Sequence, residues 1–81
     1  MHSYANVRIC DEDGNFKYSM EVKNYEEALK FFQVCQESEI PITCRKEGKE
    51  DCEAWIEDID VQFGNDGMMF SINLYCEILS N

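Results

Sequence analysis

The chain has 81 residues, an apolar fraction of 44% and a formal charge of −10, from 17 acidic and 7 basic side chains. This length predicts one domain over residues 1–81, and the apolar fraction is too high for a disordered segment. The acidity excludes direct binding to a phosphate backbone or to a bare anionic membrane surface, both of which need clustered Lys and Arg.

The N-terminus and the cysteines predict a cytoplasmic protein without a disulfide framework. Residues 1–6 have neither the basic segment nor the apolar segment of a secretory signal. The longest apolar runs, such as 68–70, are far too short to span a bilayer. Five cysteines at irregular spacing favour small buried thiols: Cys10, Cys35, Cys44, Cys52 and Cys76.

The first element in the chain is predicted to be a β-hairpin. Between residues 4 and 10, and again between 16 and 22, apolar and polar side chains alternate with the two-residue period of a half-buried strand. The connecting segment contains Asp13-Gly14, a pair expected where a tight turn requires a positive φ.

A helix is predicted to follow, beginning after Asn24 and ending near Ser38 or Glu39. Asn24 with Glu27 three residues later has the pattern of an N-cap with a returning carboxylate. The apolar residues then recur at helical spacing: Tyr25, Ala28, Leu29, Phe32 and Cys35. Pro41 disfavours helical geometry at the preceding residue, so residues 40–45 are predicted to form a short edge strand.

Residues 50–60 fit two patterns. As a helix, the segment would be capped by Asp51 and would carry Cys52, Trp55, Ile56 and Ile59 on one face. As a strand, one face would hold Trp55, Ile59, Val61 and Phe63, and the other Ile56, Asp58, Asp60 and Gln62. The β-branched residues and the turn signal at 64–67 favour the strand.

The last strand is unambiguous, and it completes the predicted fold. Apolar side chains alternate from Met68 to Ile78, while the other face has Met69, Ser71, Asn73, Tyr75 and Glu77. The order ββαβββ predicts an α+β two-layer sandwich, with an antiparallel sheet of 4–5 strands and one helix on one face. The opposite face is then solvated or meets a partner, for which Tyr75, Met69 and Leu79 are candidates.

No recognisable catalytic or metal-binding motif is present, so the sequence predicts neither an enzyme nor a bound cofactor or metal. The single histidine, His2, lies at the N-terminus, where it cannot serve a nucleophile held on a rigid element. The cysteine spacings match no zinc motif, although adjacent strands could bring Cys44 and Cys52 together. The turn at residues 11–15 has oxygen ligands but not the complete calcium loop.

The acidic run at residues 47–60 is the candidate functional feature, with seven acidic residues and one basic residue. Carboxylates two positions apart on a strand are about 6.5–7 Å apart, close to the phosphate interval of one DNA strand. Residues 11–13 would extend the field if the first hairpin lay beside it. The predicted partner-binding residues are Glu50, Asp51, Glu53, Trp55, Glu57, Asp58 and Asp60, with Trp55 as an apolar anchor ringed by charge.

In size, acidity and absence of catalytic residues the chain resembles the small proteins with which bacteriophages and mobile elements block restriction or CRISPR complexes. The resemblance implies an inhibitor that docks on the basic groove of a nucleic-acid-handling protein. Three alternatives stay open. The first is a solvated face that only maintains solubility, and the second is a small adaptor subunit that assembles through its open sheet face or an edge strand, with a homodimer as one form. The third is a thiol or metal module, which mass spectrometry of the native protein would reveal.

Overall fold

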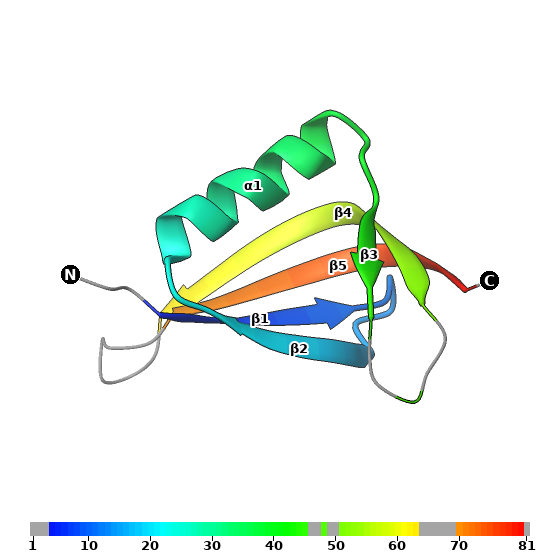
Figure 1. Ribbon diagram of the computed structural model, residues 1–81, viewed down its shortest axis with the longest axis horizontal. Helices are drawn as coiled ribbons and strands as arrows, with labels where there is room; N and C mark the ends of the chain where they lie inside the picture. Colours follow the sequence, from blue (N-terminus) through cyan, green and yellow to red (C-terminus); the bar gives the residue numbers. More distant parts are fainter. Residues whose placement is uncertain (1–3, 46–47, 49–50, 64–69, 81) are drawn as a thin grey trace.

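The computed structural model describes residues 4–45, 48, 51–63 and 70–80, and its elements follow the predicted order (Figure 1). These are β1 (Ala5–Cys10), β2 (Phe16–Val22), α1 (Tyr25–Glu37), β3 (Ile42–Cys44), β4 (Cys52–Phe63) and β5 (Phe70–Ser80). The α+β class is therefore confirmed. The helix α1 is neither long nor apolar enough to cross a membrane.

The five strands form one curled sheet in the order β2-β1-β5-β4-β3, and its directions are mixed (Figure 1). β1 and β5 are parallel, whereas the other neighbouring pairs are antiparallel. The prediction of an antiparallel sheet is therefore wrong for the pair β1–β5. The reason is that turn signals determine only local pairings, whereas the most apolar strand, β5, is buried best between β1 and β4.

The turn between β1 and β2 is held by the carboxylate of Asp11. Its Oδ1 accepts hydrogen bonds from the backbone N–H of Asp13 at 3.0 Å and of Asn15 at 2.8 Å, which makes an Asx-type turn. Gly14 has φ +87° and donates to the Asp11 carbonyl at 3.0 Å. The positive φ predicted for this glycine is thus confirmed.

The helix α1 has the predicted limits. The Asn24 side chain accepts a hydrogen bond from the Glu27 N–H at 3.1 Å, as an N-cap does. Ser38 follows the last helical residue, and Glu39 has φ 54°, a left-handed conformation that ends the helix. Phe32 and Cys35 are buried against the sheet, in agreement with the predicted apolar stripe.

The segment that fitted two patterns is the strand β4, and it contains a β-bulge at Glu57. Ile56 pairs with Cys76 and Asp58 with Tyr75, so Glu57 has no partner on β5. One extra residue shifts the alternation by one position. The core face of β4 therefore carries Cys52, Ala54 and Ile56 before the bulge and Ile59 and Val61 after it.

This bulge corrects the predicted faces of β4. Trp55 pairs with Glu77 and Ile56 with Cys76, so Trp55 does not share a face with Ile59, and Ile56 lies in the core at 7% exposure. The assignment of Asp58, Asp60 and Gln62 to the outer face agrees with their exposure. The turn predicted at 64–67, together with Met68 and Met69, lies outside the described residues.

The core lies between α1 and one face of the sheet, but α1 covers that face only in part. Its closest contacts are with β4, and an apolar hollow remains between α1, β2 and β3. The fold is therefore less closed than a complete two-layer sandwich. All five cysteines are buried free thiols, which confirms their prediction as small core side chains.

Candidate functional site: an acidic cluster at the bulge

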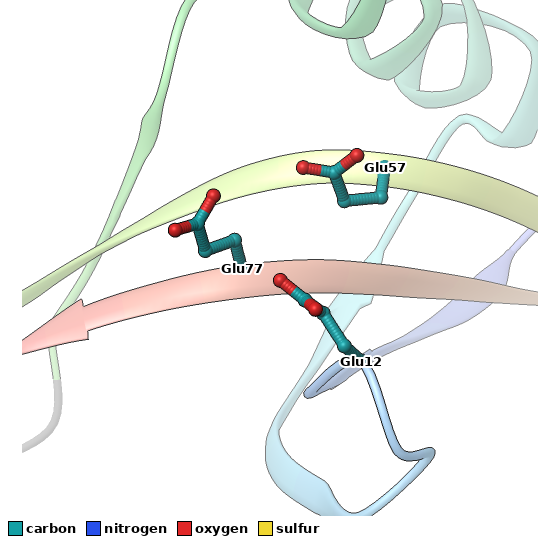
Figure 2. A group of neighbouring side chains, drawn as sticks. All are labelled: Glu12, Glu57 and Glu77. Carbon is teal, nitrogen blue, oxygen red and sulfur yellow. The ribbon is translucent and has the colours of Figure 1, made fainter.

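Three glutamates from different parts of the chain converge at the bulge of β4. Glu12 comes from the turn after β1, Glu57 is the bulged residue, and Glu77 lies on β5 (Figure 2). One carboxylate oxygen from each lies within 4.8 Å of the others, and all three side chains are exposed. These residues are called the glutamate triad below.

The sheet register explains why these three residues meet. Cys10 is level with Tyr75 in the parallel pair β1–β5, so the chain beyond Cys10 continues beside Cys76 and Glu77. On the other side of β5, Ile56 is level with Cys76, which brings the following residue, Glu57, to the same point. The parallel pairing and the bulge therefore position the triad together.

Other features of the fold hold the triad in place. The Gln36 side chain at the end of α1 donates a hydrogen bond of 2.8 Å to the Glu57 carbonyl. At the turn that carries Glu12, hydrogen bonds from Asn15 to the Asp11 carboxylate lower the pKa of Asp11. The segments that carry Glu57 and Glu12 are thus fixed by polar contacts that do not use the triad carboxylates.

No ion pair neutralises the triad within the part of the chain that the structure describes. The two ion pairs found there join Lys17 to Asp11 at 3.9 Å and Arg45 to Asp51 at 3.5 Å. A further acid, Asp58, follows Glu57 in the sequence and lines a shallow hollow with Glu12, Glu57 and Tyr75. Like charges concentrated without counter-charges raise the local negative potential and cost stability.

Trp55 lies beside the triad. It pairs with Glu77 across the β4–β5 ladder and lines a hollow of about 460 Å³ with Glu57, Glu77 and the end of α1. Its side chain is half-buried, and the indole Nε1 is shielded without a hydrogen-bond acceptor in the described protein. A large aromatic ring with an unused donor is therefore adjacent to unpaired carboxylates.

The other predicted site residues do not all gather at this point. Asp51 is paired with Arg45, and Glu53 is exposed near the start of β4, opposite Leu79. Asp58 and Asp60 lie two positions apart on the outer face, where Asp58 Oδ1 accepts from the Ile59 N–H at 2.9 Å. Glu50 lies outside the described residues, as does His2.

Sequence reasoning included Glu12 only conditionally and missed Glu77. The condition was that the first hairpin lies beside the acidic run; β5 separates the hairpin from β4, but its turn still brings Glu12 to the bulge. Glu77 was placed on the outer face of the last strand, but nothing in its neighbourhood in the sequence indicates a cluster. Its detection required the register with Trp55, which depends on the bulge.

The triad also has the oxygen chemistry that a hard cation prefers. Oxygens within 4.8 Å of one another can all contact one Ca²⁺, because Ca²⁺–oxygen distances are about 2.3–2.6 Å. Exposed acidic groups commonly meet without an ion, however, and among the described residues no buried ligand joins the three glutamates. The arrangement is therefore an electrostatic surface.

The thiols Cys44 and Cys52 also lie opposite each other, on β3 and β4. The Cys52 thiol donates to the Tyr18 hydroxyl at 3.2 Å, and burial raises the pKa of Cys44 to about 11. The Cys44 thiol is therefore protonated at neutral pH, and both side chains are buried as packing groups.

No protein-family model, curated protein sequence or solved structure matches this chain. Function is therefore inferred from the site alone.

Proposed function

We propose that the protein is a non-enzymatic inhibitor that docks its acidic surface on the basic, nucleic-acid-binding groove of a partner protein. The observation that carries this proposal is the glutamate triad, an exposed and unneutralised group of carboxylates next to a half-buried tryptophan. A basic groove would supply the missing counter-charges, and Trp55 would supply an apolar anchor near the centre of the interface.

The charge distribution favours this function over general solubility. A solvated surface needs only dispersed charges, with both signs interspersed. Here three carboxylates from three segments lie within 4.8 Å of one another, while Lys17 and Arg45 are paired elsewhere. Asp58 and Asp60 extend the negative surface along β4 at the spacing of alternate strand residues, about 6.5–7 Å, which approximates successive phosphates.

The proposal is tested by competition for DNA. Duplex DNA bound to a CRISPR effector or restriction complex is titrated with this protein, and the fraction of bound DNA is measured by gel shift. The double variant Glu57→Gln/Glu77→Gln should inhibit at least tenfold more weakly than the unmodified chain, equivalent to ~1.4 kcal/mol. Inhibition should also weaken as salt rises, because salt screens the charge pairs.

The matched control is Glu21→Gln/Glu26→Gln, which removes the same charge from exposed positions on β2 and α1. It should inhibit within twofold of the unmodified chain. Equal losses in both double variants would mean that only net charge matters, and the proposal of a specific acidic site would be wrong. Inhibition that does not depend on salt would contradict it as well.

A second candidate is an adaptor subunit that assembles through the outer sheet face. Leu79 is 47% exposed there, but it lies opposite Glu53, and the same face also carries Asn6, Arg8 and Asn73, so the face is mainly polar. Replacing Leu79 by serine should abolish assembly under this second candidate and should leave DNA competition intact under the first.

A further inference from the structure

An apolar trough runs between the two end strands of the sheet, away from the acidic triad. Its larger part, about 900 Å³, lies between α1, β2 and the segment that enters β3. Four of its apolar side chains are about half exposed: Met20 at 45%, Phe31 at 58%, Val34 at 50% and Ile40 at 49%. The helix α1 thus leaves apolar surface open on the side facing β2.

The trough continues between β2 and β3 themselves. A second hollow of about 610 Å³ is lined by Tyr18 and Met20 of β2 and by Thr43 and Cys44 of β3. Ile9, Met20 and Thr43 line both hollows, so the two are contiguous. The Tyr18 side chain reaches across to Cys52, where it accepts the hydrogen bond from the thiol at 3.2 Å.

Both strands that border the trough have a free edge. β2 pairs with β1 and β3 pairs with β4, and these are the two ends of the sheet. Within the described residues, the backbone of β2 makes no turn, loop or side-chain hydrogen bond beyond that ladder. Every second residue of such an edge directs its N–H and C=O groups outward, available to another strand.

We infer that this trough binds an extended peptide segment of a partner protein, which adds a strand to the free edge of β2. Backbone hydrogen bonds to β2 would supply part of the affinity, and apolar side chains at alternate positions of the peptide would enter the trough between Met20, Phe31 and Ile40. The bulge at Lys17 interrupts the edge, so Tyr18–Val22 offers about five residues for pairing, ~17 Å.

Charge complementarity defines the peptide further. Within the trough the Glu27 carboxylate is offset by Lys23, and Arg45, which lines the second hollow, is paired with Asp51. Glu21 is exposed on the other face of β2, and the chain as a whole carries −10. A segment with basic residues beside its apolar core is therefore attracted, whereas a second copy of this chain is repelled. The inference does not depend on the acidic triad, which lies at another part of the sheet.

The experiment is a selection of random twelve-residue peptides displayed on messenger RNA against the folded protein. Selected peptides should show alternating apolar residues with Lys or Arg nearby, and their binding should protect amides in residues 18–22 from hydrogen exchange. N-methylation of alternate peptide amides should lower affinity at least tenfold, because it removes the backbone donors.

The variant Phe31→Ser tests the trough, and Leu79→Ser is its matched control. Both side chains are about half exposed, at 58% and 47%, but Leu79 lies on the outer face of β5, opposite Glu53 and outside the trough. Phe31→Ser should weaken binding at least tenfold, and Leu79→Ser by less than twofold. Failure of either comparison contradicts the inference.

Each of the following outcomes overturns the inference. Peptides with apolar residues at helical spacing would indicate a helix in the groove. Protection of the same amides by self-association, seen as a dimer in sedimentation, would indicate a second copy. An absence of enriched peptides, or binding without protection of β2, would show that the edge does not accept a strand.

Discussion

Replacing Glu57 by glutamine should stabilise the protein, because it removes the central charge of the glutamate triad. Two unit charges 4.8 Å apart in water repel each other by about 0.9 kcal/mol. Glu57 faces two such charges, and side-chain relaxation reduces the sum. The expected gain is therefore about 1 kcal/mol at low salt, which corresponds to a rise of about 1 M in the urea midpoint of a small domain.

The assay is urea unfolding followed by tryptophan fluorescence at 10 mM and at 1 M NaCl. Glu21→Gln is the control, because it removes the same net charge from an exposed position opposite the neutral Asn6. The difference between the two variants isolates the triad from the general repulsion of the chain. At 1 M salt, where the screening length is about 3 Å, this difference should disappear.

The electrostatic reasoning is refuted if Glu57→Gln and Glu21→Gln change the midpoint equally at 10 mM NaCl. It is also refuted if their difference persists at 1 M NaCl, since the gain would then come from strand propensity or packing. A measured loss of stability in Glu57→Gln would mean that the carboxylate has a stabilising role at the bulge.

Three further predictions concern the fold. Burial raises the pKa of Cys44 to about 11 and of Cys76 to about 12, so each thiol is protonated when folded and ionises near pH 9 when unfolded. The free energy of unfolding in urea should therefore fall above pH 9, by about 1.4 kcal/mol per pH unit for each thiol. A flat profile up to pH 10.5 would contradict this. Leu74→Ala, at a position with 0% exposure on the central strand, should cost about 3 kcal/mol in urea unfolding, and a loss under 1 kcal/mol would show that β5 is not the core. Asn24→Ala should cost about 1 kcal/mol by removing the bond to the Glu27 N–H, with Asn24→Ser as the variant that retains stability.

The elements that the sequence predicted correctly are those with local signals. The first hairpin depends on alternation and on a glycine that needs a positive φ, and α1 depends on its cap and its apolar stripe. Each signal lies within a few residues of the structure it determines. The parallel pairing of β1 with β5 has no such signal, because about 60 residues separate the strands and only burial decides their order.

The bulge in β4 was within reach of the sequence but was not identified. Cys52, Ala54 and Ile56 form one run with a two-residue period, and Ile59, Val61 and Phe63 form a second run displaced by one position. The slip between the runs places apolar residues three and four apart, which is why the segment also fitted a helix. The slip itself is the signature of a bulge at residues 57–58, and only a bulge reconciles both runs with one core.

The candidate site depends on the same irregularity. Of its members, Trp55 and Glu57 were predicted from the acidic run, whereas Glu77 follows only from the register. The charges of Asp51 and Asp11, in contrast, are matched by Arg45 and Lys17 within the chain. The spacing of acidic residues in the sequence therefore overestimated the negative potential at the start of β4 and underestimated it at the bulge.

At residue 57 the backbone serves the fold, whereas the carboxylate belongs only to the triad. The bulge keeps Ile56 and Ile59 in one core, and the Glu57 backbone carbonyl receives the Gln36 side chain; neither role uses the Glu57 carboxylate. Glu12 and Glu77 likewise occupy exposed positions that any polar residue could fill. Three acids at these positions add repulsion that folding does not need. The proposed interaction with a positively charged partner would give that cost a physical reason.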